Sequence, residues 1–141
     1  MKIYTLGYSG WTHEAIQEVL DRIDGVLIDI RMVPRSRCLR WDGSTFARKY
    51  GDRYVKVKQF GNVNYKGTMA QVRILDFAAG VEIVRELTKT GRAPILLCGC
   101  PDVNQCHRKI LAARLAEAWG AEVEHITRPG KHDLPGQTNL F

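Results

Sequence analysis

The sequence predicts an α/β fold, a single three-layer domain with a mostly parallel sheet flanked by helices. Short runs of apolar and β-branched residues alternate along the chain with longer segments of helical periodicity, and this order favours parallel strands joined by helical crossovers. The 141 residues suffice for one hydrophobic core. A hydrophobic fraction of 45% and a charged fraction of 26% are typical of a globular protein.

Strands are predicted where apolar residues follow one another without interruption. The first run covers residues 3–6, and the last covers residues 121–126. The runs 26–30 and 94–98 are apolar enough for strands that are buried on both faces of a sheet. Residues 54–57 alternate in polarity, which is typical of an exposed or edge strand.

Helices are predicted from apolar spacing and from residues that cap helix ends. Thr12 precedes a helix whose apolar residues recur at helical spacing, and Ser44 is the expected cap of a short helix that ends at Tyr50. Residues 70–90 have a helical pattern that Gly80 is expected to divide. A further helix is predicted over residues 107–119, because a glycine follows it directly.

The domain is predicted to cover residues 1–127, and residues 128–141 to form an irregular tail. The tail ends in Gln-Thr-Asn-Leu-Phe. These five residues resemble the Q-x-x-L-F peptide by which replication and repair enzymes bind bacterial sliding clamps. Gln137 would hydrogen-bond at the edge of an apolar pocket that Leu140 and Phe141 fill. The alternative, which we favour, is that the two apolar residues pack on this domain's own core.

Positive charge is concentrated in residues 31–58, which contain nine basic and two acidic residues. This segment has a net charge of +7. The whole chain has a net charge of +6, so the remaining residues sum to −1. Such a segment is typical either of a surface for a polyanion or phosphorylated ligand, or of a solvated basic face. Its aromatic residues would suit single-stranded nucleic acid, whose bases stack on rings. We expect Trp41 to be exposed for this purpose and Phe46 to lie in the core.

The predicted site lies at the carboxyl edge of the sheet, where ligands bind in folds of this class. That rule brings together residues 7–10, 31–37 and 99–108. Cys106, His107 and Arg108 begin the last helix, and a helix N-terminus attracts anions and favours a thiolate. Arg31 and Arg35 would complete a cationic pocket with them.

Three interpretations of the cysteines compete. In the first, a cysteine is a nucleophile that His107 assists, while arginines hold phosphate or sulfur oxyanions. In the second, Cys98, Cys100, Cys106 and His107 bind a metal such as zinc, although the spacing matches no closed structural zinc site. In the third, Cys98 ends a buried strand as a small apolar residue. We predict no metal, because of this spacing, and no nucleotide cofactor, because no glycine-rich fingerprint is present.

The N-terminal residues and the lengths of the apolar runs indicate where the protein is located and whether it contacts a membrane. The N-terminus lacks a signal-peptide pattern, and no apolar run approaches the ~20 residues needed to span a bilayer. We therefore expect a cytoplasmic protein with four free thiols and no membrane partner.

Four stretches of the chain together resemble the bacterial and archaeal domain-of-unknown-function 488 family. They are residues 3–9, residues 27–31 with 34–36, residues 96–98 with 106–108, and residues 140–141. The resemblance implies an α/β fold and a site formed by Tyr8, Arg31, Arg35, Cys98, Cys106, His107 and Arg108. It also implies an acidic residue where this chain has Cys100. No settled reaction comes with the family.

These observations define a predicted site and function. The predicted catalytic residues are Cys98, Cys106, His107 and Arg108, and the predicted substrate-binding residues are Tyr8, Ser9, Arg31, Arg35 and Trp41. The predicted function is a Cys/His-dependent hydrolase or transferase with a phosphate-bearing substrate such as nucleic acid. The alternatives are a non-catalytic nucleic-acid-associated module recruited through its C-terminal peptide, and a thiol redox or metal-sensing domain.

Overall fold

The computed structural model describes residues 1–128 and contains one five-stranded sheet in which every neighbouring pair is parallel. The strand order is β3-β2-β4-β1-β5. The strands are β1 (Lys2–Gly7), β2 (Gly25–Asp29), β3 (Tyr54–Lys56), β4 (Ala93–Cys98) and β5 (Glu122–His125). The predicted α/β fold with a parallel sheet is confirmed, and the short strand β3 lies at an edge, as its alternating pattern indicates.

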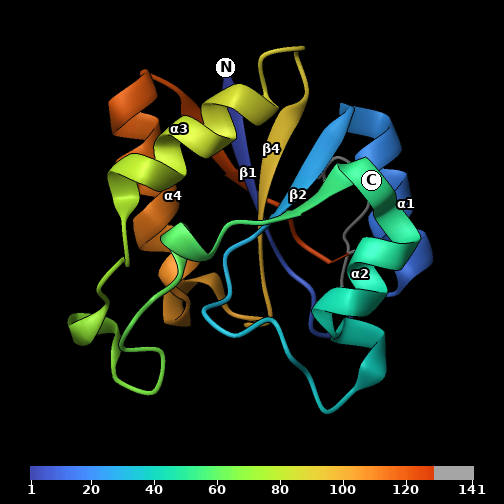
Figure 1. Ribbon diagram of the computed structural model, residues 1–141, viewed down its shortest axis with the longest axis horizontal. Helices are drawn as coiled ribbons and strands as arrows, with labels where there is room; N and C mark the ends of the chain where they lie inside the picture. The colour runs from blue at the N-terminus through green and yellow to red at the C-terminus, as the bar shows by residue number, and fades with distance from the viewer. Residues whose placement is uncertain (129–141) are drawn as a thin grey trace, which may run out of the picture.

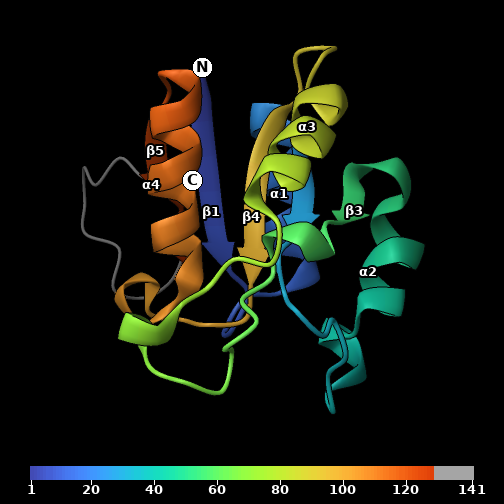
Figure 2. The same ribbon diagram turned by 60° about the vertical axis from the view of Figure 1, so that its left-hand side comes forward.

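Four helices cover the two faces of the sheet (Figure 1). They are α1 (His13–Ile23), α2 (Gly43–Tyr50), α3 (Phe77–Leu87) and α4 (His107–Trp119). The first two pack on one face and the last two on the other, which gives three layers and two separate apolar cores. Figure 2 shows α2 and α4 on opposite sides of the strands.

Side chains from the central strands alternate between these two cores. Leu27 lies in the core beneath α1 and α2, whereas its neighbour Ile28 lies in the core beneath α3 and α4. Leu97 and Leu96 on β4 divide in the same way. A strand that is covered on both faces must be apolar at successive positions, which explains the uninterrupted runs in the sequence.

The central strands end at the same level, and their following loops therefore meet. Gly7 pairs with Cys98 in the register of β1 and β4, and Asp29 pairs with Leu97 in that of β2 and β4. Just beyond the sheet, the Tyr8 amide donates a hydrogen bond to the Cys98 carbonyl oxygen at 2.9 Å. The predicted convergence of the three loops is confirmed.

The segment predicted as a divided helix over residues 70–90 differs from that prediction. α3 begins only at Phe77, because the Asp76 side chain accepts a hydrogen bond from an amide in the first turn at 3.1 Å. Residues before it form a loop with the single turn η4 (Met69–Gln71). Gly80 does not break the helix and is buried in it against Phe60.

The predicted caps are confirmed at two helices and wrong at a third. Thr12 caps α1, and Gly120 ends α4 in the left-handed conformation at a φ of 61°. At α2 the cap is Asp42, whose carboxylate accepts hydrogen bonds from both the amide and the hydroxyl group of Ser44. Because α2 begins at Gly43, Ser44 lies inside the first turn, and its amide is one of the helix donors that the cap residue satisfies.

Two predictions concern the ends of the chain and membranes. Apart from Arg128, the predicted tail, with Gln137, Leu140 and Phe141, lies outside the described residues. Within residues 1–128, none of the helices combines the length and the apolar character that a membrane crossing requires.

Candidate functional site

The candidate site is built around the loop between β4 and α4, residues 99–106, which includes the short turn η5 (Val103–Gln105). The loop is held against the end of β1, because the Ser9 hydroxyl group donates a hydrogen bond to the Gly99 carbonyl oxygen. Its own turn is stabilised by the Asp102 carboxylate, which accepts from the Asn104 amide at 2.9 Å. The loop therefore has a defined shape between two rigid elements.

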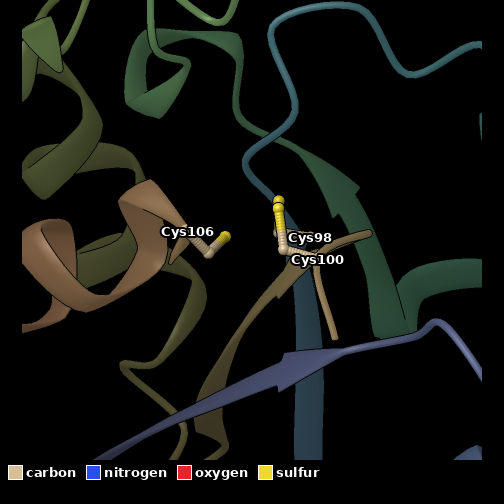
Figure 3. A group of neighbouring side chains, drawn as sticks. All are labelled: Cys98, Cys100 and Cys106. Carbon is tan, nitrogen blue, oxygen red and sulfur yellow. The ribbon is translucent and has the colours of Figure 1, made fainter. Parts of the chain in front are cut away.

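Three of the four cysteines gather at this loop and form what we call the thiol cluster. Cys98 ends β4, Cys100 lies in the loop, and Cys106 immediately precedes α4. Their Sγ atoms all lie within 4.8 Å of one another, and Figure 3 shows Cys106 pointing toward the other two. Cys98 and Cys106 are buried, Cys100 is half-buried, and Cys38 lies elsewhere and is exposed.

Hydrogen bonding within the cluster moves the pKa values of its thiols in opposite directions. The pKa of Cys106 lies well below its usual range, first because the Cys100 and Cys98 thiols hydrogen-bond to its sulfur. The start of α4, with His107, acts in the same direction. Hydrogen bonding to Cys100 and then to Cys106 raises the pKa of Cys98, and hydrogen bonding to Cys106 raises that of Cys100. Cys106 is therefore the thiol of the cluster that ionises most readily.

His107 begins α4 directly after Cys106. Its Nε2 atom lies 3.1 Å from the Ile30 carbonyl oxygen. A carbonyl oxygen only accepts hydrogen bonds, so Nε2 carries a hydrogen. Cys106 and His107, which the sequence predicts as a cysteine–histidine pair, therefore lie together at the start of α4.

Arg31 is held by a buried network at the end of β2. Its guanidinium donates to the Asp29 carboxylate at 2.7 and 2.9 Å, to the Trp41 carbonyl oxygen at 2.7 Å and to the Tyr8 hydroxyl group at 3.0 Å. The Tyr54 hydroxyl group also donates to Asp29. Most of the donors of Arg31 are therefore used within the protein.

The prediction that Trp41 is exposed is wrong. Its side chain is 9% exposed and stacks on the Tyr8 ring, with a centroid distance of 4.8 Å. The turn η1 (Leu39–Trp41) brings the Trp41 carbonyl group to Arg31, and the indole ring packs inward against Phe46. Phe46 is fully buried, as predicted.

Two clefts flank the loop, so the predicted single cationic pocket is divided. The thiol cleft, with a volume of about 710 Å³, is lined by Tyr8, Arg31, Cys98, Cys100 and His107, with residues 62–72 on its far side. The Arg108 cleft, of about 530 Å³, is lined by Arg108, Ser9, Trp11, His125 and Arg128, among others. Arg35 is exposed and lines neither of them.

Arg108 is the most unusual charge at the site. Its side chain is 3% exposed, and its guanidinium donates only to neutral oxygens, the Cys100 carbonyl group at 2.7 Å and the Thr5 hydroxyl group at 3.4 Å. Within residues 1–128 no carboxylate lies at ion-pair distance from it. Gly7 leaves room for it, because an added Cβ would lie 2.9 Å from Nη1.

The Arg108 cleft contains two cationic or titratable residues that the sequence analysis missed. His125 ends β5, and its Nδ1 atom lies 2.6 Å from the Thr5 hydroxyl oxygen; burial, followed by the charge of Arg108, lowers its pKa. Arg128 lies on the exposed rim near Gly10. None of the described residues that line this cleft is acidic. Finding them requires the strand order, which places β5 beside β1.

One comparison with known proteins yields a match. The family model described as "Domain of unknown function DUF488" matches residues 13–115. The chain belongs to the DUF488 family. The DUF488 match contains Arg31 and the Cys106-His107-Arg108 run, whereas residues 3–9 and 140–141 lie outside it. No curated protein and no solved structure matches the chain. The family's description names no reaction.

Proposed function

We propose that this chain binds a phosphate-bearing ligand in the Arg108 cleft. The observation that carries the proposal is the buried guanidinium of Arg108, which has no carboxylate partner among residues 1–128. A buried charge is costly unless it is paired, and an anion in the cleft supplies the missing counter-charge. Guanidinium groups match phosphate oxygens in a two-pronged arrangement.

A phosphate group suits this cleft better than a single carboxylate does. Arg108 and Arg128 reach it from α4 and from the segment after β5, whereas the Ser9 hydroxyl group lines the cleft but donates its hydrogen to Gly99. Two guanidinium groups that converge from different elements match an anion with several oxygens on different sides. Trp11 adds an apolar wall for the part of the ligand that follows the phosphate.

The thiol cluster extends this proposal toward catalysis. It lies along the same loop, and Cys106 and His107 are the thiolate and the neighbouring base that a hydrolase or transferase mechanism needs. Cys106 is only 1% exposed, so a covalent step on the bound ligand requires residues 99–105 to move. Binding at Arg108 is therefore the first step to test.

The test is titration of the full chain with inorganic phosphate and pyrophosphate by isothermal titration calorimetry. Arg108→Lys keeps the positive charge but removes the paired N–H donors of the guanidinium. We expect the affinity for phosphate to fall about tenfold or more, since hydrogen bonds to charged groups contribute about 1.5–3 kcal/mol. Arg128→Ala, on the exposed rim, should weaken binding less, by a factor of up to about 5, because an exposed charge contact contributes about 0.2–1 kcal/mol.

Arg35→Ala is the matched control, because it removes the same charge from an exposed position that lines neither cleft. Its affinity for phosphate should equal that of the parent chain. If the parent binds neither anion, or if both cleft variants bind as tightly as the control, the Arg108 cleft is not an anion site.

A second candidate function, association with nucleic acid, rests on the basic segment, residues 31–58. Seven of its nine cations are exposed, and none of the seven forms an ion pair with a described residue: Arg35, Arg37, Arg40, Arg48, Lys49, Lys56 and Lys58. Unpaired surface cations favour a polyanion partner. The burial of Trp41 removes the predicted stacking platform, so contact with phosphates would dominate.

Two further predictions accompany these proposals. Recruitment to a sliding-clamp-like partner through Gln137, Leu140 and Phe141 stays a prediction, because these residues lie outside the described part of the chain. A cytoplasmic location agrees with three free thiols in close contact, which a reducing compartment keeps reduced.

A further inference from the structure

We propose that the thiol cluster is a binding site for one thiophilic metal ion, with Cys98, Cys100 and Cys106 as its three protein ligands. The three ligands are not among the side chains proposed to bind phosphate, although Arg108 also holds the Cys100 carbonyl group, so the two proposals are tested with different variants. The three Sγ atoms already lie within 4.8 Å of one another. Sulfurs at about 2.3 Å from a tetrahedral zinc ion are about 3.8 Å apart, so only a small inward movement is required.

Two of the three ligands come from rigid elements. Cys98 ends β4, where its neighbour in the sheet is Gly7 of β1. Cys106 lies against the first turn of α4, and its amide donates to the Val103 carbonyl oxygen at 3.2 Å. Cys100 lies in the loop, but its carbonyl group is held by Arg108 at 2.7 Å. A site with two fixed ligands and one adjustable ligand is largely pre-organised.

Apolar packing does not account for this arrangement. Cys98 and Cys106 belong to the core beneath α3 and α4, where each could serve as a small apolar residue. Cys100 is only half-buried and lies in a loop, yet its sulfur is within 4.8 Å of the other two and not directed into solvent. The convergence of three sulfurs is the feature that packing leaves unexplained.

The surroundings can balance the charge that three thiolates would bring. The N-terminal end of α4 and the guanidinium of Arg108 are positive and lie next to the cluster. A bound cation neutralises most of the remaining charge, and the ligands release their protons as it binds.

The protein leaves one coordination position open. His107 is not part of the set, because among residues 1–128 the potential ligand atoms that gather here, with either ring nitrogen of a histidine considered, are those of the three cysteines alone. Cys98 and Cys100 both line the thiol cleft, so a fourth ligand would come from water or from a molecule in that cleft. An open fourth position is typical of metal sites that act on a ligand.

Three sulfur ligands select the class of ion. Thiolates favour Zn²⁺ and Cu⁺ over Mg²⁺ and Ca²⁺, which prefer oxygen. A substitution at residue 100 distinguishes Zn²⁺ binding from Cu⁺ binding. Cys100→Glu replaces one sulfur ligand by a carboxylate, which zinc accepts and Cu⁺ disfavours.

The experiment is metal titration of the full chain after reduction and removal of metal by a chelator. Co²⁺ serves as the spectroscopic probe, because thiolate ligands give it a strong charge-transfer absorption, and Zn²⁺ and Cu⁺ are then measured by competition. We expect one ion per chain and protection of Cys98, Cys100 and Cys106, but not Cys38, from alkylation. Cys100→Ser should weaken Zn²⁺ binding by about 100-fold or more, since changes outside the ligand set already cost about 10- to 100-fold.

Cys38→Ser is the matched control, because Cys38 is exposed and outside the cluster. Its metal affinity should equal that of the parent. Cys100→Ser changes a half-buried loop residue, and its circular dichroism spectrum and melting temperature establish that it is folded. A reduced parent chain that takes up less than one ion, or equal losses in Cys38→Ser and Cys100→Ser, would overturn the proposal. So would a cluster that forms a disulfide but binds no metal once reduced.

Discussion

At the scale of single residues, the partner of a buried charge separates structural from ligand-binding arginines. The side chains of Arg31 and Asp29 are 9% and 0% exposed and form a salt bridge of 2.7 Å. Tyr8, Trp41 and Tyr54 complete the hydrogen bonds around this pair. Arg108 is equally buried but has no such partner among the described residues. The sequence alone makes the two arginines look equivalent.

Asp29→Asn should destabilise the fold, because it leaves Arg31 as a buried charge without a counter-ion. Breaking one partner of a buried pair costs about 3–5 kcal/mol. The measurement is urea unfolding, with the midpoint compared at an unchanged slope. Asp21→Asn is the control, since it removes the exposed partner of Arg53 at 2.9 Å and should leave the midpoint nearly unchanged. Equal losses in the two variants would contradict a structural role for the buried pair.

At the scale of elements, Gly80 shows how packing replaces local propensity. In sequence it is a weak point of a helix, but in the structure it is the place where α3 meets the turn η3 (Lys58–Phe60). An added Cβ would lie 2.3 Å from Cε1 of Phe60. Phe60 is fully buried, so its ring has little room to move aside.

Gly80→Ala should therefore destabilise the protein, although alanine is the better helix former by about 1 kcal/mol. Overpacking a core costs about 1–3 kcal/mol, so we expect a net loss of about 1 kcal/mol in urea unfolding. Adding Phe60→Leu to Gly80→Ala should recover part of that loss, because the smaller side chain makes room for the methyl group. A stabilised single variant would show that α3 is free to move away from Phe60.

At the scale of the whole molecule, charge is distributed unevenly over the fold. The basic segment carries +7, and its exposed cations lie between β2 and α2, on α2, at the end of β3 and in the turn η3. The cations at the end of α3 and just beyond it differ, because Arg85 and Lys89 pair with glutamates three residues earlier. A polyanion should therefore prefer the basic segment.

Arg48→Glu combined with Lys49→Glu should weaken binding of single-stranded oligonucleotides about tenfold at low salt and reduce the slope of log affinity against log salt concentration. Fluorescence anisotropy across a salt series is the measurement. Arg85→Glu combined with Lys89→Glu changes the net charge equally, at the end of α3 and just beyond it, and should have a smaller effect. Equal effects of the two double variants would mean that net charge alone, and not the basic segment, attracts the polyanion.

The sequence by itself determined the fold class, the central strands and the bounds of α4. These features follow from local signals, namely apolar runs, helical spacing and end caps, which act between residues close in the chain. It also identified Cys98, Cys106, His107 and Arg108 as a group, because three of them are consecutive and the topology brings the fourth to the same edge.

Only the tertiary structure decided what each of these residues contacts. In the folded chain the Cys100 thiol lies close to those of the other two cysteines, and Trp41 faces inward. Arg31 forms an ion pair with Asp29, and His125 lines the same cleft as Arg108. Most of these contacts depend on strand order and on the path of loops, which bring together groups far apart in sequence. Their energies come from burial and pairing in three dimensions, and no local pattern in the chain records them.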